Sequence, residues 1–313
     1  MAKYLVTGGA GFIGSNLVRF LLGRQQDVVV VDNYATGKPE NLTDVIDRIE
    51  MIEADIRDRA ALDRAVAGVA GIFHEAALGS VPRSVKDPKE SHDVNVNGTI
   101  AVLEAARAAG VKRVVFAASS SAYGDQPDSP KHERMAPRPI SPYAAGKLAC
   151  EAYMSAYAAA YGLQTLSLRY FNVFGPYQDP FGAYAAVIPA FVSHLLRGAP
   201  PTVYGDGEQT RDFCYIDNVC HANWLAMQAP PQACRGQAMN IACNQSTSLN
   251  QILAILGELL KRNVKPEYRP PRPGDVRHSL ADYGLARQTI GYEPLVYFEE
   301  GLRRAINWYE KNV

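Results

Sequence analysis

The chain has 313 residues, and its 32 Lys and Arg residues balance its 32 Asp and Glu residues. A formal charge of zero gives no general electrostatic reason to bind nucleic acid or an acidic membrane surface. Hydrophobic residues make up 47% of the chain, which is ordinary for a globular protein with one large or two modest domains. No apolar run approaches the roughly 20 residues of a membrane span, so we expect neither a nucleic-acid nor a membrane partner.

The cysteines and histidines give no sign of a disulfide framework or a metal site. The cysteines are Cys150, Cys214, Cys220, Cys234 and Cys243. They are odd in number and scattered, so we interpret them as buried free thiols of a cytoplasmic protein. The six histidines show no metal-ligand spacing, and no metal is expected. The chain begins directly with a strand pattern, so no targeting segment is expected.

Short apolar runs alternate with helical patterns through the first half of the chain. Strands are expected at residues 4–6, 28–31, 51–52, 71–74, 114–117 and 166–170, and helices near 12–22, 59–67, 93–109 and 143–161. Ser141 should cap the last of these helices, with Pro142 at its first position. The alternation predicts an α/β fold with a doubly wound parallel (Rossmann) sheet of about seven strands.

After Phe174, proline and glycine become frequent, which predicts a smaller, loop-rich α/β substrate domain. We expect residues 1–171 to form a dinucleotide-binding domain, to which residues 212–243 return. Residues 172–211 and 244–313 should form the substrate domain. The expected helices at 92–109 and 142–161 are rich in Ala on more than one face, so either a dimer partner or deep burial against the sheet explains them.

A glycine loop follows the first strand and opens the first helix. Gly8, Gly11 and Gly14 form a G-x-x-G-x-x-G pattern, which permits a tight turn, close approach of a pyrophosphate and close helix packing. Asp32 closes the second strand and should accept hydrogen bonds from the adenosine ribose. Because its carboxylate would repel a 2′-phosphate, the pattern favours NAD over NADP.

The remaining strand ends supply further candidate cofactor contacts. Asp55 could bind the adenine amine or cap a helix, and these two roles are left open. His74 is expected to be a packed histidine rather than a catalyst. The other expected cofactor-binding residues are Phe12, Ile13, Asn33, Ile56, Ala76, Ala77 and Asn95.

Tyr143 and Lys147 are the most informative pair in the chain. Four residues apart on a helix, they lie on one face within a turn of each other. An ammonium group near a phenol favours the phenolate, which is a base strong enough to take a proton from a sugar alcohol. Ser119, Ser120 and Ser121 follow the fifth strand, where a hydroxyl can bind a sugar hydroxyl and pass its proton to Tyr143.

These motifs together resemble the extended short-chain dehydrogenase/reductase family. The stretches at residues 77–84, 169–175, 178–180, 182–189, 211–216 and 272–279 resemble those of nucleotide-sugar 4-epimerases, and in particular of bacterial UDP-N-acetylglucosamine 4-epimerases of surface-polysaccharide pathways. The resemblance implies NAD, a UDP-sugar substrate and a homodimer. It also implies Tyr143 as the base, Lys147 as its electrostatic partner and ribose ligand, and Ser119 as the hydroxyl relay.

The resemblance further implies where the UDP-sugar lies. It places Asn172, Arg211 and Arg272 at the pyrophosphate and Asp275 at the uridine ribose, although each arginine could instead form a surface ion pair. Ser279 falls where epimerases of non-acetylated sugars resemble one another in carrying tyrosine, so it leaves room for a 2-acetamido group, unless it is simply a small loop residue. The residues expected at the sugar end are Gly79, Ser80, Ser120, Ser121 and Gln178.

Several rival functions are weighed against this hypothesis. The sequence does not clearly distinguish an epimerase of UDP-N-acetylglucosamine from a 4-epimerase of UDP-glucose or of a UDP-hexuronate. For the hexuronate, Arg83 and Arg277 could bind the C6 carboxylate. The 4,6-dehydratases of the family resemble one another in carrying an Asp-Glu pair directly after the relay residue, which supplies the acid and the base of the elimination. Here Ser120 and Ser121 occupy those two positions and cannot serve as that pair. A non-catalytic NAD-binding protein typically lacks the tyrosine or the lysine, and both are present.

Overall fold

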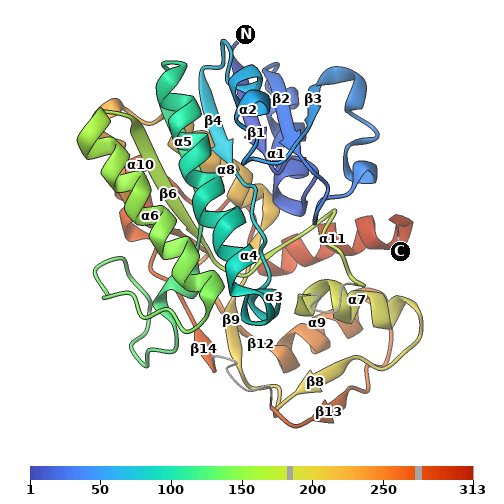
Figure 1. Cartoon of the computed structure of the whole chain (residues 1–313). Helices are drawn as coiled ribbons and strands as arrows, with labels where there is room; N and C mark the ends of the chain where they lie inside the picture. The colour runs from blue at the N-terminus through green and yellow to red at the C-terminus, as the bar shows by residue number, and fades with distance from the viewer. Residues whose placement is uncertain (182–185, 272–276, 313) are drawn as a thin grey trace.

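A seven-stranded parallel sheet forms the centre of the molecule (Figure 1). The structure, a computed structural model, describes residues 1–181, 186–271 and 277–312. In spatial order the strands are β11 (Arg235–Ile241), β6 (Gln164–Tyr170), β5 (Arg113–Ser119), β4 (Gly71–His74), β1 (Lys3–Thr7), β2 (Asp27–Asp32) and β3 (Glu50–Glu53). Every neighbouring pair is parallel. The predicted doubly wound sheet of about seven strands is therefore confirmed.

The strand order creates a switch point beside β1. The chain builds β1, β2 and β3 in one direction and then crosses back to place β4, β5 and β6 on the other side of β1. At the carboxyl edge, Thr7 lies opposite Val31 and His74, and Ser119 lies opposite Tyr170. Loops that leave the two sides of a switch point diverge, and the crevice between them is where such sheets bind ligands.

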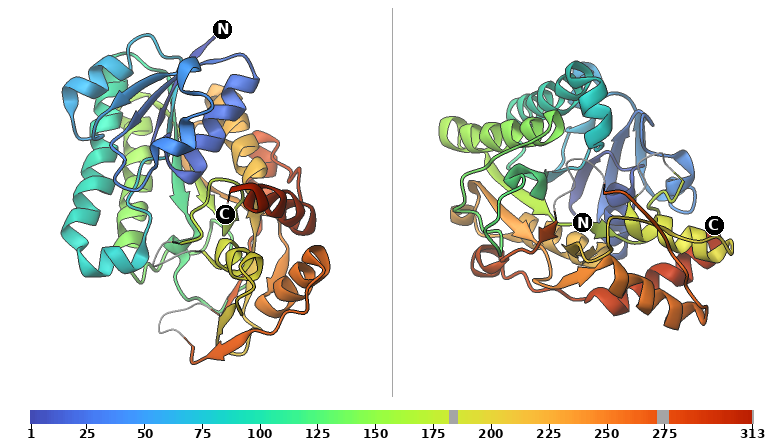
Figure 2. Two further views of the ribbon diagram at one scale, coloured as in Figure 1. Left: turned by 90° about the vertical axis from the view of Figure 1, so that its right-hand side faces the viewer. Right: turned by 90° about the horizontal axis from the view of Figure 1, so that it is seen from below.

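Helices cover both faces of the sheet (Figures 1 and 2). The helices are α1 (Phe12–Gly23) and α8 (Ile216–Gln228) on one face, and α2 (Arg59–Ala65), α5 (Gly98–Ala108) and α6 (Pro142–Tyr161) on the other. Successive side chains of a strand point to opposite faces. Val6 accordingly packs in the core that contains α1, and its neighbour Leu5 packs in the core that contains α2. Within the described ranges, none of these helices is both long and apolar enough to cross a membrane.

Local sequence explains the bounds of α6. The Ser141 hydroxyl accepts a hydrogen bond from the Ala144 amide at 3.2 Å, and Pro142 occupies the first helical position, as predicted. Gly162 ends the helix with φ at 71°, a conformation that glycine adopts without strain. The helix expected at 93–109 differs, because a π-helical turn at Asp93–Asn97 precedes α5.

The C-terminal region is smaller and built from short elements, as expected. Its strands are β7 (Val173–Phe174), β8 (Thr202–Tyr204), β9 (Thr210–Asp212), β10 (Cys214–Tyr215), β12 (Ser246–Ser248), β13 (Glu267–Arg269) and β14 (His278–Ser279), and its helices are α7 (Val187–Leu196), α9 (Leu249–Leu260), α10 (Gly284–Ile290) and α11 (Phe298–Asn312). Two short helices, α3 (Val81–Lys86) and α4 (Pro88–His92), follow β4. The segment 212–243 supplies α8 and β11 to the central sheet layer, whereas the exact division into two domains stays a prediction.

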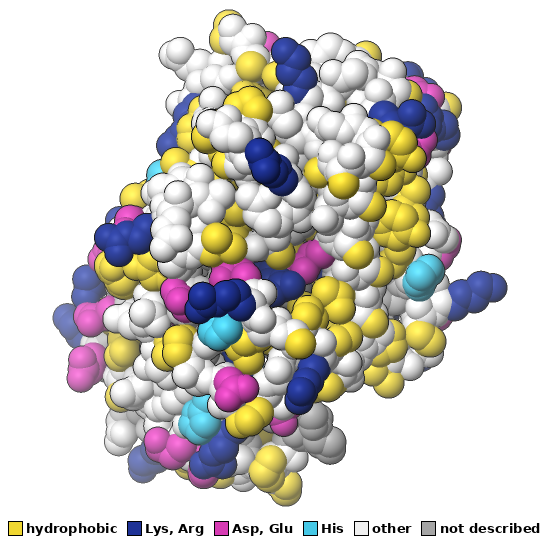
Figure 3. All heavy atoms as spheres, turned by 90° about the vertical axis from the view of Figure 1, so that its left-hand side faces the viewer, with side chains coloured by type: hydrophobic (Ala, Val, Ile, Leu, Met, Phe, Trp, Pro, Cys, Tyr) yellow, Lys and Arg dark blue, Asp and Glu magenta, His cyan; other side chains and the backbone are white. Residues whose placement is uncertain are grey.

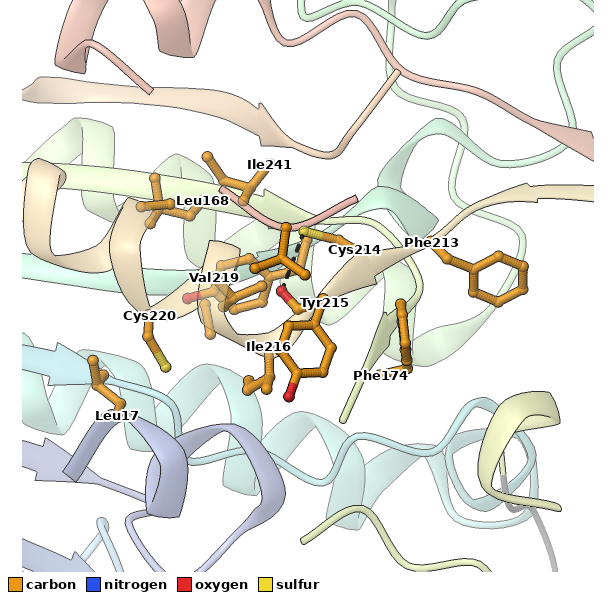
Figure 4. Close-up of a cluster of buried hydrophobic side chains, with 14 of the residues drawn as sticks. Leu17, Leu168, Phe174, Phe213, Cys214, Tyr215, Ile216, Val219, Cys220 and Ile241 are labelled. Carbon is orange, nitrogen blue, oxygen red and sulfur yellow. Dashed lines mark hydrogen bonds between the residues drawn. The ribbon is translucent and has the colours of Figure 1, made fainter. Parts of the chain in front are cut away.

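One apolar core joins the C-terminal region to the sheet. In Figure 4, Leu17 of α1 and Cys220 of α8 lie at one end of this cluster, and Phe174 and Phe213 lie at the other. Phe213 also packs on Phe298 of α11, with ring centroids 5.3 Å apart. Continuous burial of this kind holds the two regions together, since each square ångström of apolar surface removed from water is stabilising.

A buried ion pair fastens α6 to the sheet. Arg169 of β6 donates two hydrogen bonds to the Glu151 carboxylate of α6, at 2.9 and 2.6 Å, and both side chains are almost fully buried. The Arg169 guanidinium also lies over the Tyr123 ring, 4.7 Å from its centroid. Because α6 carries Tyr143 and Lys147, this pair helps to fix their position.

We expect Glu151→Gln to lower the free energy of unfolding by about 3–5 kcal/mol, because it leaves the Arg169 charge buried without a counter-charge. Chemical denaturation measures the change. Asp63→Asn is the matched control, since the Arg59–Asp63 pair of α2 is half exposed and its loss should leave the denaturation midpoint unchanged. Equal midpoints for the wild type and Glu151→Gln would contradict this role.

Candidate active site

The glycine loop at the start of α1 is shaped for close contact with a ligand. Gly8 has φ at 70°, and a Cβ placed there would lie 2.7 Å from the backbone of Ala76. A Cβ at Gly14 would lie 2.1 Å from the Gly8 carbonyl oxygen. Gly11 is the N-cap of α1 and has no side chain to cover the first amides of the helix. The positive end of α1 is therefore open to an anion such as a pyrophosphate.

Asp32 sits at the end of β2 beside this loop, as predicted. Its carboxylate accepts hydrogen bonds from the Ala10 amide at 2.9 Å and the Tyr34 amide at 2.8 Å. Burial raises the pKa of Asp32, and these backbone hydrogen bonds oppose that effect. The amide contacts hold the carboxylate at the rim of the crevice, where a ribose diol could reach it.

The structure decides one alternative left open for Asp55. The N-cap of α2 is Asp58, whose side chain accepts a hydrogen bond from the Ala61 amide at 3.1 Å, so Asp55 does not have that role. Asp55 instead pairs with Arg57 at 2.7 Å and accepts a hydrogen bond from Asn33 at 3.0 Å. The hydrogen bond from Arg57 lowers the pKa of Asp55 and keeps it ionised. Contact of Asp55 with an adenine amine stays a prediction.

A single cleft of about 640 Å³ runs along the carboxyl edge of the sheet. It brings together most residues that the sequence nominated, namely Gly8, Gly11, Phe12, Ile13, Gly14, Asp32, Asn33, Asp55, Ile56, Ala76, Ala77, Gly79, Ser80, Tyr143, Lys147 and Gln178. The glycine loop, Asp32 and Asp55 therefore share one cleft with the tyrosine, the lysine and Ser80. A cleft of this size, with few polar groups on a largely apolar lining, is typical of a cofactor or ligand site.

Tyr143 and Lys147 face this cleft from the first turns of α6. The Lys147 ammonium is buried, donates a hydrogen bond to the Ala117 carbonyl at 2.6 Å and lies 4.7 Å from the centroid of the Phe116 ring. The Tyr143 amide donates a hydrogen bond to the Ser84 hydroxyl of α3 at 3.1 Å. Neighbouring elements thus hold the backbone at Tyr143 and the Lys147 ammonium, and both residues line the same cleft.

The three serines lie together at the carboxyl end of β5. Ser119 accepts hydrogen bonds from the Ser121 amide at 3.2 Å and from the Ser121 hydroxyl at 2.9 Å, and it caps the 3-10 turn at Ser120–Tyr123. Among the described residues, the cleft wall includes Ala117 and Ala118 but none of these serines. Their roles as relay and sugar ligands therefore stay predictions.

Asn95 also lies behind the cleft rather than in its wall. Its side-chain oxygen accepts a hydrogen bond from the Leu78 amide at 2.8 Å, and its amide nitrogen donates to the Leu78 carbonyl at 3.3 Å. The π-helical turn that carries Asn95 thus supports the segment between Ala77 and Gly79. Spacing alone could not reveal this, because the partner backbone lies 17 residues away.

A second hollow, of about 270 Å³, contains two residues expected at the pyrophosphate. Asn172 and Arg211 both line it. Asn172 has φ at 32° and donates a hydrogen bond to the Asp212 carbonyl at 2.9 Å. Arg211 donates to the Thr210 carbonyl at 2.8 Å. Ser279 lies opposite Arg211 in the register of β14 and β9, and Arg272 and Asp275 lie outside the described residues.

His74 is a packed residue, as expected. Its Nδ1 lies 2.7 Å from the Thr7 hydroxyl and its Nε2 lies 2.9 Å from the Thr99 hydroxyl. Burial lowers the pKa of His74 to about 3, so the ring is neutral at physiological pH. All five cysteines are buried free thiols, again as expected.

Glu75, which lines the cleft beside the lysine, was not among the predicted site residues. Its carboxylate accepts a hydrogen bond from the Tyr170 hydroxyl at 2.9 Å, and burial raises the pKa of Glu75 to about 7. An acid among small residues at the end of a predicted strand was the signal available. Such a signal is weak because most exposed strand ends carry polar residues without a function.

Comparison with known proteins assigns this architecture. Residues 4–242 match the model of the NAD dependent epimerase/dehydratase family. The chain belongs to this family, and its cofactor is NAD. The glycine loop, the open helix end and Asp32 fit that cofactor.

Among its relatives, the UDP-glucose 4-epimerase of Mycolicibacterium smegmatis is 40% identical over 98% of both chains. Two solved structures resemble this chain in both fold and sequence. One is a UDP-N-acetylglucosamine 4-epimerase from Methanobrevibacter ruminantium in complex with UDP-N-acetylmuramic acid, with a TM-score of 0.94 and 38% identity over 100% of this chain and 99% of that one. The other is a UDP-glucose 4-epimerase from Thermotoga maritima with UDP-glucose, with a TM-score of 0.93 and 39% identity over 99% of both chains. Within the family, the chain is therefore a nucleotide-sugar 4-epimerase.

We expect Gly14→Ala to abolish NAD binding, because the added methyl group would collide with the Gly8 carbonyl and displace α1 from the loop. A calorimetric titration with NAD measures the affinity of each variant. Gly23→Ala is the control on the same helix, since a Cβ there meets no atom within 4 Å. Tight NAD binding by the Gly14 variant would show that the loop is not the pyrophosphate site.

Proposed function

We propose that the enzyme interconverts UDP-N-acetylglucosamine and UDP-N-acetylgalactosamine by epimerisation at C4 of the sugar. The observation that carries the proposal is that Tyr143 and Lys147 share one cleft with the glycine loop and Asp32. Held by the glycine loop and Asp32, NAD would supply the acceptor for the C4 hydride and the source from which the hydride returns to the sugar. The reaction then has no net redox change, and the chain needs only one base.

We propose that Tyr143 is the base that accepts the proton of the sugar O4 hydroxyl. As a phenolate it takes the proton from the O4 hydroxyl when the hydride leaves C4, and it returns the proton when the hydride comes back. Lys147 supplies the positive charge that favours the phenolate, and its hydrogen bond to Ala117 keeps the ammonium in place. Ser119 is proposed to relay the proton between the O4 hydroxyl and Tyr143.

The nucleotide end must stay anchored while the 4-keto sugar turns over. Asn172 and Arg211 lie together in the second hollow, and a guanidinium fork suits a phosphate. We propose that these two residues hold the pyrophosphate, with Arg272 beside them and Asp275 at the uridine ribose. Gly79, Ser80, Ser120, Ser121 and Gln178 are proposed to contact the sugar.

The choice of an acetylated sugar rests on Ser279. Its side chain is small, and it pairs in register with Arg211, one of the two residues proposed to hold the pyrophosphate. A small residue there leaves room for an acetamido group, and polar groups nearby could pair with the amide. The structural neighbour that acts on UDP-N-acetylglucosamine is consistent with this choice.

UDP-glucose is the second candidate substrate, because the relatives from Mycolicibacterium smegmatis and Thermotoga maritima are UDP-glucose 4-epimerases. UDP-glucuronate is a third, since a relative from Thermodesulfobacterium geofontis, 33% identical over 100% of this chain, is a UDP-glucuronate 4-epimerase. Incubation with all three UDP-sugars and separation of the products decides between them. Exclusive turnover of either non-acetylated sugar would overturn the acetylated assignment.

We also propose that the enzyme is a cytoplasmic homodimer. The side of the molecule that carries α6 shows hydrophobic side chains among charged ones (Figure 3). Tyr153 and Tyr161 of α6 are 39% and 56% exposed, and several exposed alanines lie on the same helix. A second copy of the chain would cover this surface, and sedimentation measures the oligomeric state. Buried free thiols suit a reducing compartment.

Tyr143→Phe should lower turnover by at least roughly 100-fold, because it removes the base that accepts the O4 proton. Affinity for NAD and for UDP should change little, since the ring and the helix remain. Product analysis and calorimetry measure the two properties. Near-normal turnover in this variant would exclude Tyr143 as the base.

Ser279→Tyr should remove activity on UDP-N-acetylglucosamine before activity on UDP-glucose, because the phenol would fill the space for the acetamido group. The measurement is kcat/KM for both substrates. Ser246→Tyr, the same change at an exposed position of β12 on the other side of β9, should alter neither. An equal loss on both substrates in the Ser279 variant would contradict this account of substrate choice.

A further inference from the structure

Glu75 is a half-buried acid in the wall of the cleft, and nothing in the proposed reaction uses it. It follows β4 directly and lines the same cleft as Tyr143 and Lys147. Its Oε1 accepts the hydrogen bond from Tyr170. Its Oε2 is inaccessible to solvent and has no hydrogen-bond partner among the described residues. Such an oxygen is expensive to leave unpaired unless the site serves another purpose.

A chain of hydrogen bonds determines where a proton on Glu75 must sit. The side-chain amide of Asn223, on α8, donates a hydrogen bond to the Tyr170 hydroxyl oxygen at 2.7 Å. Tyr170 then donates its own proton to Oε1 of Glu75 at 2.9 Å. Because Oε1 is already an acceptor, protonation of Glu75 places the proton on Oε2. Loss of that proton leaves a full negative charge in the wall of the cleft.

The surroundings of Glu75 leave this charge incompletely compensated. Burial is the largest effect and raises its pKa to about 7, and the Tyr170 hydrogen bond and the Lys147 charge oppose the rise. The Lys147 ammonium is itself committed to the Ala117 carbonyl. A further positive charge in this part of the cleft would therefore be favoured over a neutral group.

We propose that the Glu75 carboxylate selects the oxidised form of the cofactor, because the nicotinamide ring is positively charged when oxidised and neutral when reduced. The proposal rests on the proposed function, which places that ring beside Tyr143. It gives the enzyme a means to return its hydride to the sugar rather than remain in the reduced form. Glu75 acts here through charge, and no direct contact with the ring is required.

The test compares the binding of NAD⁺ and NADH to the full chain and to Glu75→Gln. The amide keeps an oxygen for the Tyr170 hydrogen bond, removes the charge and places an NH2 group where Oε2 lies. Competition titrations, with NADH fluorescence as the readout, give both Kd values without turnover. At a pH about two units above the Glu75 pKa, we expect the preference for NAD⁺ over NADH to fall roughly tenfold in the variant. Glu40→Gln, on the exposed turn at Pro39–Leu42, should leave the preference unchanged.

The pH dependence has a definite sign. The groups that face Glu75 are Lys147 from α6, Tyr170 from β6 and Cys220 from α8, and its neighbour His74 is neutral. Burial also raises the pKa of Cys220 far above its ordinary value, which leaves Glu75 as the group that titrates near pH 7. The wild-type preference for NAD⁺ should therefore be large above the Glu75 pKa and decline toward that of the variant as the pH falls below it.

Stability separates this role from a merely structural one. An ionised Glu75 opposes folding in the absence of a cation, so Glu75→Gln should not lower the thermal midpoint of the cofactor-free protein above pH 7, even as it weakens NAD⁺ binding. An unchanged ratio of the two Kd values, at all pH values, would overturn the proposal. A wild type that binds neither form of the cofactor would instead overturn the proposed function, and the inference with it.

Discussion

The hydrogen bond from the Lys147 ammonium to the Ala117 carbonyl determines how the site is assembled. It joins the first turns of α6 to the carboxyl end of β5, which is the edge of the sheet where the cleft opens. A buried ammonium is unfavourable without partners, so this contact and the Phe116 ring confine Lys147 to one position. Tyr143 lies one helical turn away, so the same helix carries it into the wall of the cleft.

The wider fold supports the same arrangement at two distances. Near the site, the Ser84 hydroxyl accepts a hydrogen bond from the backbone amide of Tyr143, and the Ser141 side chain caps the start of the helix. Farther along α6, the buried pair of Glu151 and Arg169 fixes the helix to β6. The helix is therefore fixed at its start and at its middle, which is what a base requires if it must meet one hydroxyl of a bound sugar.

The cleft contains both a fixed positive charge and a group that can carry a negative one. Lys147 favours a phenolate, and an ionised Glu75 favours a cation. These two preferences correspond to the charged forms that the proposed reaction needs at its start, a deprotonated tyrosine and an oxidised ring. Burial strengthens both effects because charges interact more strongly away from water.

Local patterns predicted much of this structure. The β-branched runs predicted the strands, the glycine loop predicted the opening of α1, and Ser141 with Pro142 predicted the start of α6. Contacts between distant segments were not predictable in the same way. The support of Leu78 by Asn95, the chain from Asn223 to Glu75, and the register of Ser279 against Arg211 depend on packing between elements far apart in sequence. Local pattern was not always decisive either. Asp55 was a candidate N-cap, but the N-cap of α2 is Asp58, three residues later.

The fate of the C4 hydrogen tests the central claim most directly. A UDP-sugar that carries deuterium at C4 is incubated with the enzyme in ordinary water, and the epimer is analysed for its isotope. If Tyr143 removes only the O4 proton and the cofactor holds the hydride within the cleft, the deuterium stays at C4 of the product. Exchange of that deuterium with solvent hydrogen would contradict the account, because it would mean that the carbon itself is deprotonated by a base.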